Sequence, residues 1–184
     1  MSIQIDTDIP AGNGIVSRIE GDEVWFAPDL RDTEGHWFYW HLRVRGAAGR
    51  KLKFHITSEY TLTVRGPAVS TDGGWSWQWK GWSEDDGWGF AHEFGDNDHD
   101  VRFSMGMPYT QRNWDRFAST LAGRGDVRLQ TLCETRKGRA VELVELGRSD
   151  APAAQTVLIA ARHHCCEMMA SYALEGLIQA VLGS

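Results

Sequence analysis

The sequence predicts an antiparallel β-sandwich over residues 1–104, followed over residues 105–184 by the opening portion of an α/β domain. Two patterns carry this prediction. Short runs rich in β-branched and aromatic residues, separated by Gly, Asp and Pro, fill residues 13–104, whereas a different pattern with helical spacing begins after residue 105. The chain has 184 residues, of which 42% are apolar and 24% charged, and is therefore long enough and apolar enough to bury a core.

The candidate strands of the first part are short and closely spaced. Leu42 and Val44 alternate with Arg43 and Arg45, as expected for a strand with one face buried and the other in water. Two runs flank a turn at Gly21-Asp22 within residues 15–30, and further strands are predicted within residues 36–46, 50–59, 60–66, 75–82, 88–94 and 100–106. This number of short strands favours a β-sandwich or an open barrel.

The second part mixes helical and strand patterns. Trp114, Phe117 and Leu121 have helical spacing within residues 109–123, and Gly123 is well placed to end that helix. Next come a hairpin over 126–135 and 140–147, a polar loop over 148–155, a short apolar run "TVLIAA" over 156–161 and a final helix over 167–182. The run 156–161 is uninterrupted by charge, which predicts a strand covered on both faces.

Charge, hydropathy and cysteine usage narrow the class of protein. The formal net charge of -6 argues against nucleic acid as a partner. No run approaches the roughly 18 apolar residues of a membrane span, and the first ten residues lack the pattern of a signal peptide, so we expect a cytoplasmic protein. Cys133, Cys165 and Cys166 form no disulfide framework, and three unpaired thiols fit a reducing compartment.

The sequence "HHCCE" over residues 163–167 is the strongest candidate for chemistry. A buried strand that runs directly into a helix places the intervening residues at the carboxyl edge of a sheet, where open α/β folds build their sites. His164 and Glu167 have the spacing H-x-x-E and are two of the three protein ligands of a His₂Glu zinc site. In the alternative interpretation, Glu167 is a first-turn residue favoured by the helix dipole, His164 is a loop residue, and neither binds metal.

The segment "ARHHCCEMMASYALEGLIQAVL", residues 161–182, resembles the first zinc-ligand segment of the zinc metallocarboxypeptidases, in the branch that contains the cytosolic carboxypeptidases and their bacterial relatives. That branch has a short apolar strand, an Arg-x-His-x-x-Glu segment, and a helix with small residues and a Glu-Gly pair. The matching positions here are "VLIAA", Arg162, His164, Glu167, "MASY" and Glu175-Gly176. The upstream segments "WFYWHLRVRGAAGRKLKFHI" and "FSMGMPYTQRNWDRF" are similar to the β-sandwich domain of that branch and its junction with the catalytic domain.

The resemblance implies a zinc-dependent hydrolase that removes C-terminal residues from peptides or proteins. It implies His164 and Glu167 as zinc ligands, with a third His ligand and a general-base Glu far downstream. Many members have Pro-Gly between the two ligands, where this chain has Cys165-Cys166. We interpret these cysteines as packing residues rather than ligands, and His163 as a structural neighbour.

The third ligand has no candidate in this sequence. Glu167 is followed by 17 residues without a His, and the other histidines outside the motif lie in the predicted sandwich at positions 36, 41, 55, 92 and 99. We therefore expect the chain to be the N-terminal part of a longer enzyme, to be nearly inactive alone, and to expose an apolar patch on the segment 156–161 and the last helix.

Two other motifs offer alternatives. Trp75, Trp77 and Trp79 would share one face of a strand and form a ladder of indole rings. On a non-catalytic β-sandwich module, such a ladder could bind carbohydrate or protein. In the alternative interpretation, the three side chains belong to the core or to a surface that docks on the following domain. The segment "HEFGDNDHD" gathers Asp96, Asp98, His99 and Asp100 but does not fit an EF-hand, so we expect a solvated loop rather than a calcium site.

Overall fold

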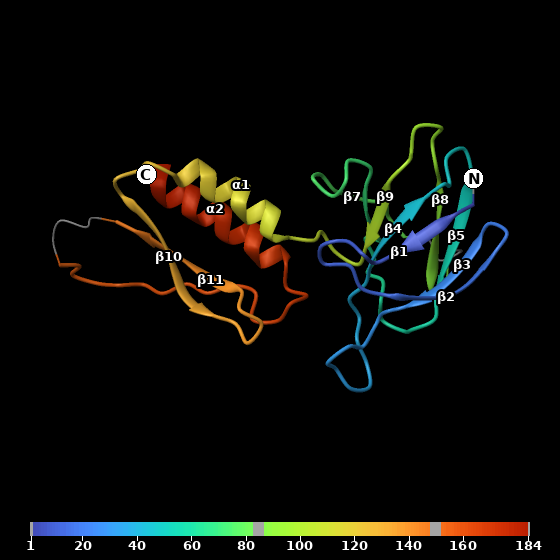
Figure 1. Ribbon diagram of the computed structural model, residues 1–184, viewed down its shortest axis with the longest axis horizontal. Coiled ribbons are helices and arrows are strands. Elements are labelled where there is room, and N and C mark those ends of the chain that lie inside the picture. The colour runs from blue at the N-terminus through green and yellow to red at the C-terminus, as the bar shows by residue number, and fades with distance from the viewer. Residues whose placement is uncertain (1, 83–86, 148–151, 184) are drawn as a thin grey trace. The chain divides into compact units, whose positions relative to one another are not determined.

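The computed structural model describes residues 2–82, 87–147 and 152–183, and the chain forms two compact units, Met1–Pro108 and Tyr109–Ser184. Figure 1 labels most of the helices and strands of both units. In the described part of the chain, neither helix has the length and hydropathy that crossing a bilayer requires.

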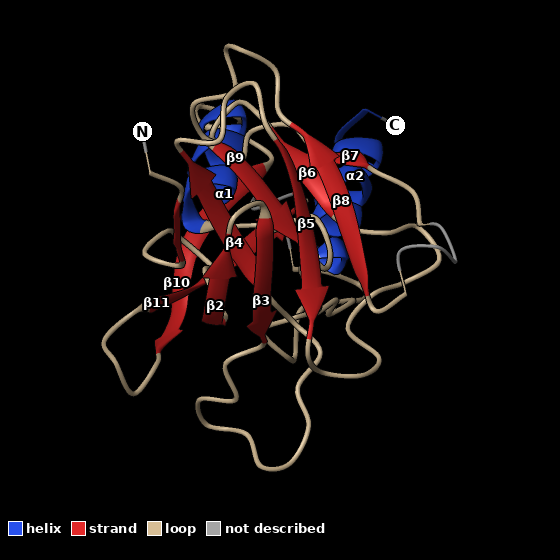
Figure 2. Ribbon diagram, turned by 90° about the vertical axis from the view of Figure 1, so that its right-hand side faces the viewer, coloured by secondary structure: helices blue, strands red, loops and turns tan. Residues whose placement is uncertain are grey.

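The Met1–Pro108 unit contains a five-stranded sheet in the order β1-β4-β9-β6-β7, of which Figure 2 labels β4, β9, β6 and β7. All neighbouring strands of this sheet pair antiparallel. The strands are β1 (Gln4–Asp6), β4 (His41–Arg45), β9 (Val101–Ser104), β6 (Ala68–Ser70) and β7 (Gln78–Trp79). Strand β4, which lies between β1 and β9, shows the predicted alternation, because Leu42 and Val44 are fully buried while Arg45 is exposed.

A second sheet of four strands has the order β2-β3-β5-β8. Its strands are β2 (Ile15–Glu20), β3 (Glu23–Ala27), β5 (Lys51–Ile56) and β8 (Gly89–Glu93). The prediction of a purely antiparallel architecture was wrong here, because β3 and β5 pair in parallel. After β3 the chain forms β4 in the five-stranded sheet. It then returns to the four-stranded sheet at the end where β3 began, so β5 runs in the same direction as β3.

The two sheets share one hydrophobic core. Phe26 and Phe54 come from the four-stranded sheet, and Leu42 and Phe103 come from the five-stranded sheet; all four are fully buried in one cluster. Trp40 immediately precedes β4, is also fully buried, and donates from its indole Nε1 to the carbonyl of Thr61 at 2.8 Å. The tryptophan therefore fills the core and satisfies its polar atom at the same time.

In this unit two strand predictions need correction and two strands were missed. Residues 60–66 were predicted as a strand, yet they form turns, and Tyr60 has a φ of 56°, a left-handed conformation that no strand contains. The strand of this region is β6 instead, and neither β6 nor β1 was predicted. The predicted strand over 75–82 is reduced to the two residues of β7.

The Tyr109–Ser184 unit packs two helices against a hairpin (Figure 1). Helix α1 (Gln111–Leu121) and the antiparallel strands β10 (Val127–Glu134) and β11 (Ala140–Leu146) confirm the predicted helix and hairpin. Helix α2 (Met169–Gly183) confirms the last predicted helix. Phe117 and Leu121 of α1 pack with Ile178 of α2, and apolar side chains of the hairpin close this smaller core.

The prediction of a buried strand over 156–161 was wrong for the chain as it stands. These residues have no strand structure, and Val157 and Leu158 are 80% and 82% exposed. The apolar pattern indicates burial, but among the described residues of this unit the hairpin strands β10 and β11 pair with each other and no strand pairs with the segment. Exposed Leu177 and Val181 of α2 add to the apolar surface, as expected. Residues 148–151 of the predicted polar loop lie outside the described residues.

Candidate metal site

His164 and Glu167 meet in the turn that precedes helix α2. The Nδ1 atom of His164 lies 2.7 Å from Oε1 of Glu167, and the backbone N–H of His164 donates to Oε2 of the same carboxylate at 3.0 Å. The H-x-x-E spacing therefore brings both side chains together as predicted. The hydrogen bonds from His164 lower the pKa of the Glu167 carboxyl group, which favours its ionised form.

The turn that carries this pair is tied to the start of α2. The N–H of Glu167 donates to the carbonyl of His164 at 3.1 Å, and the N–H of Ala170 donates to the carbonyl of Glu167 at 3.2 Å. Met168, the next residue, is only 2% exposed and anchors the turn. The pair itself faces solvent, with side-chain exposures of 74% for His164 and 44% for Glu167. The turn therefore presents an imidazole and a carboxylate side by side at an accessible surface.

The predicted position of the pair at the carboxyl edge of a sheet is wrong, because residues 156–161 do not form a strand. The correct local context is a turn followed by a helix that begins at Met169, two residues after Glu167. The pair depends on short-range geometry, which the H-x-x-E spacing captures, and not on a neighbouring sheet.

The donor set fits part of a zinc site. Imidazole nitrogens and carboxylate oxygens are zinc ligands, and here one of each lies within hydrogen-bond distance of the other. Among residues 2–82, 87–147 and 152–183, however, no group of three or more His, Cys, Asp or Glu side chains is arranged to hold a metal. The structure thus brings together one imidazole and one carboxylate, whereas a catalytic zinc site uses three protein ligands.

The neighbouring cysteines do not extend the donor set. All three cysteines are free, and Cys165 is exposed while Cys166 is half-buried. Burial raises the pKa of the Cys166 thiol, and the adjacent Cys165 raises it further. Because the thiolate is the form that binds metal, this shift disfavours ligation by Cys166.

Sequence reasoning missed two residues that support the turn. Tyr109 precedes α1 and donates from its hydroxyl to Oε1 of Glu175 on α2 at 2.5 Å. The two residues are 66 positions apart, so no local pattern in the sequence pairs them. The sequence marks Glu175 only as part of a Glu-Gly pair, and its contact with Tyr109 depends on how the two helices pack.

A groove of about 1240 Å³ opens within the same unit. It is lined by α1, the β10–β11 hairpin, residues 153–162 and α2, with Tyr109, Arg162 and Glu175 among its polar residues. His164 and Glu167 do not line it. The groove is the space left between the hairpin, the helices and the exposed segment 156–159, and it is distinct from the turn that carries the pair.

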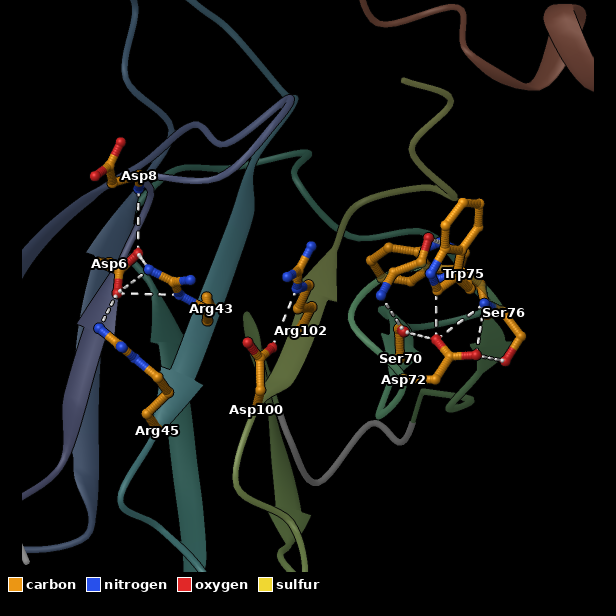
Figure 3. Close-up of polar contacts among 12 residues, drawn as sticks. Asp6, Asp8, Arg43, Arg45, Ser70, Asp72, Trp75, Ser76, Asp100 and Arg102 are labelled. Atoms are coloured by element: carbon orange, nitrogen blue, oxygen red, sulfur yellow. Dashed lines mark hydrogen bonds and ion pairs between the residues drawn. The ribbon is translucent and has the colours of Figure 1, made fainter. Parts of the chain in front are cut away.

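The predicted tryptophan ladder is not formed. Only Trp79 lies in a strand, whereas Trp75 and Trp77 belong to a loop organised by Asp72, whose carboxylate accepts hydrogen bonds from Trp75 N and from the backbone N and hydroxyl of Ser76 (Figure 3). Trp77 is half-buried and packs edge-on against His41, with ring centroids 5.5 Å apart. The three indoles therefore do not make the coplanar, bare platform that sugar stacking needs.

The Asp-rich segment forms the loop between β8 and β9, as expected. Asp98 accepts a hydrogen bond from the N–H of Gly95 at 2.8 Å, and Asp100 pairs with Arg102 at 3.1 Å (Figure 3). These carboxylates stabilise the loop and the adjacent strand, and they do not converge on a common centre.

Comparison with known proteins gives structural likeness without sequence matches. No protein-family model matches the chain, and no curated protein matches its sequence. A protein assigned as a carboxypeptidase from Burkholderia mallei ATCC 23344 aligns with a TM-score of 0.81 and 23% sequence identity. The alignment covers 97% of this chain and 47% of the Burkholderia mallei chain. A metallo-carboxypeptidase from Burkholderia cenocepacia aligns with a TM-score of 0.79 and 18% identity, over 97% of this chain and 48% of its own.

The chain has a carboxypeptidase-like fold. A third solved structure, a metallo-carboxypeptidase from Pseudomonas aeruginosa in complex with (2-guanidinoethylmercapto)succinic acid, agrees, with a TM-score of 0.77 and 24% identity over 96% of this chain. The chain spans about half the length of these carboxypeptidase structures. The shared fold includes both units, so the turn with His164 and Glu167 belongs to the carboxypeptidase-like part of the chain.

Proposed function

We propose that the chain is the N-terminal portion of a zinc-dependent metallocarboxypeptidase of the cytosolic carboxypeptidase-like branch, in which His164 and Glu167 are two of the zinc ligands. The observation that carries the proposal is the 2.7 Å approach of His164 Nδ1 to Glu167 Oε1 in a chain with a carboxypeptidase-like fold. Solved structures about twice as long as the matching region support the proposal that a third ligand and a general base come from polypeptide beyond these residues. We also propose an N-terminal β-sandwich domain over residues 1–104, a catalytic part from residue 105, and a cytoplasmic location, which the three free thiols support.

The two side chains would act as ligands in their deprotonated forms. In the metal-free chain His164 Nδ1 and Glu167 Oε1 contact each other at 2.7 Å, so a cation bound to both atoms would take the place of that contact. A zinc ion in such a site supplies Lewis-acid polarisation of a peptide carbonyl and activation of a water molecule. Two protein ligands hold zinc weakly, which explains why we expect little activity from this chain alone.

The test of the ligand assignment is zinc affinity, measured by competition with a chromophoric chelator. We expect His164→Ala and Glu167→Gln each to weaken zinc binding at least about tenfold, roughly 1.4 kcal/mol, because each removes one of two donors. His163→Ala is the matched control, since it removes an exposed neighbouring imidazole and leaves the pair intact. Equal affinity of the wild-type chain and the His164→Ala variant would contradict the assignment.

The substrate assignment needs the polypeptide that completes the fold. We propose the free C-terminus of a peptide or protein as the substrate. In the completed protein, release of the C-terminal residue from unblocked peptides should require His164 and stop when the C-terminus is amidated. Continued hydrolysis of amidated peptides would contradict the assignment as a carboxypeptidase and would indicate a zinc hydrolase of another kind.

A further inference from the structure

We propose that Arg162 is the positioning residue of the His164–Glu167 pair, and that Tyr109 and Glu175 brace it against the two helices. This inference rests on the proposed function, because it assigns a role toward a metal that the pair would hold. Hydrogen bonds that form without metal hold the turn that carries His164 and Glu167 in shape, so the two side chains are positioned before a cation binds.

The backbone turns sharply at Arg162. Its φ is 62°, in the left-handed region that residues with a Cβ rarely adopt. Only four residues other than glycine have a positive φ in the described chain, and Arg162 is the one among them that lies in the Tyr109–Ser184 unit. Such a conformation persists where surrounding contacts over-determine it, and it lies two residues before His164.

The contacts that hold this conformation come from the guanidinium group. Nη1 of Arg162 donates to the carbonyl of Tyr109 at 2.8 Å, and Nε and Nη2 donate to the carbonyl of Cys165 at 3.4 and 3.3 Å. Cys165 lies between the two ligands, so the guanidinium fork fixes the centre of the turn from one side. Because Tyr109 lies just before α1, the same fork ties the turn to the start of that helix.

Tyr109 extends the connection to helix α2. Its hydroxyl donates to Oε1 of Glu175 at 2.5 Å, and its ring packs edge-on against Tyr172 with centroids 5.0 Å apart. Burial and the Glu175 carboxylate raise the pKa of the Tyr109 hydroxyl, so it remains a donor throughout the ordinary pH range.

These contacts form a closed ring of constraints. The turn is joined to Tyr109 by Arg162, Tyr109 is joined to α2 by Glu175, and α2 is joined to the turn by its own first residues. Neither Arg162 nor Tyr109 is a natural zinc ligand, and in the described part of the chain their side chains hydrogen-bond to Cys165, Tyr109 and Glu175 rather than to the side chains of the pair. Their effect on a metal therefore has to pass through the geometry of the turn, as the effect of outer residues on metal ligands generally does.

The test compares zinc affinity, the visible absorption of bound Co²⁺ and thermal unfolding in the full chain. For Arg162→Ala we expect about tenfold weaker zinc binding and an altered Co²⁺ spectrum, with an unfolding midpoint close to that of wild type. Arg162→Lys keeps the charge but lacks the planar fork, so it should recover less than half of the lost affinity on a logarithmic scale. The control Arg136→Ala removes the same charge from the exposed turn of the hairpin and should change neither affinity nor spectrum.

The outcomes separate this inference from the proposed function. Wild-type affinity and spectrum in Arg162→Ala, combined with lost affinity in His164→Ala, overturn the positioning role alone. Unchanged affinity in His164→Ala overturns the metal site itself. A lowered midpoint with an unchanged Co²⁺ spectrum shows that Arg162 acts only on stability and also overturns the inference. If Arg162→Ala does not fold, Tyr109→Phe decides, because it removes only the hydroxyl of the brace: weaker zinc binding supports the role, and unchanged binding refutes it.

Discussion

Replacing Phe103 with alanine is expected to lower the free energy of unfolding of the Met1–Pro108 unit by about 3–5 kcal/mol. Phe103 is fully buried, and its ring lies 5.2 Å from that of Phe54 and 5.1 Å from that of Phe90, measured between centroids. These partners belong to the opposite sheet, so truncation opens a cavity at the contact between the two sheets. Urea unfolding followed by tryptophan fluorescence measures the effect as a shift of the midpoint at constant slope.

Phe38→Ala is the matched control for this prediction. Phe38 is only half-buried and stacks at an angle on Trp37, outside the shared core. The same chemical truncation there should cost much less, about 1 kcal/mol, because the site loses less buried surface. If both variants shift the midpoint equally, the assignment of the core to the contact between the sheets is wrong.

The second large effect is a loss of stability in acid that His41 causes. His41 is 1% exposed, and neither of its ring nitrogens has a hydrogen-bond partner in the described structure. Burial lowers its pKa from 6.5 to about 4, and the nearby Arg102 guanidinium lowers it further in the same direction. The unfolded chain therefore binds a proton between pH 6.5 and 4 that the folded chain does not bind.

The sign follows from that difference in bound protons. Stability contributed by neutral His41 is complete above pH 6.5 and is lost as the pH falls toward 4, where the loss reaches about 3 kcal/mol. Half-buried His92, whose pKa burial also lowers to about 4, adds to the loss over the same range. Urea unfolding at pH 7 and pH 4 measures the total.

A variant isolates the share of His41. His41→Leu should remove about 3 kcal/mol of the difference between the two pH values, and it should cost little at pH 7 because the imidazole it replaces has no polar partner to leave behind. His99→Leu, at an exposed position of the β8–β9 loop, should leave the pH dependence as in wild type. An undiminished pH dependence in His41→Leu would refute the role of His41.

The elements that were predictable from the sequence are those with local causes. The alternation of Leu42 and Val44 with arginines indicates a half-buried strand, and the spacing of Phe117 and Leu121 indicates a helix face. The H-x-x-E spacing likewise brings His164 to Glu167, since three positions of a turn suffice for the contact.

The features that were mispredicted depend on partners far along the chain. The apolar pattern of residues 156–161 indicates a buried strand, but burial needs a neighbouring strand, and the described unit supplies none. The parallel pairing of β3 with β5 follows from the placement of β4 in the other sheet, which no local signal encodes. The prediction of a tryptophan ladder was wrong for a different reason. The Asp72 carboxylate accepts hydrogen bonds from the backbone N–H groups of Trp75 and Ser76, and the loop that these bonds stabilise competes with strand formation.

The position of β4 in the five-stranded sheet has a consequence for synthesis on the ribosome. Strand β4 can pair with β1 as soon as Arg45 has emerged, but its other neighbour, β9, is complete only at Ser104. Between these two moments one edge of β4 carries unpaired backbone groups while β5 to β8 are still being made. Because such non-local pairing is slow, the nascent chain passes through a long interval in which a half-built sheet is open to association, and this is the stage at which a chaperone would protect it.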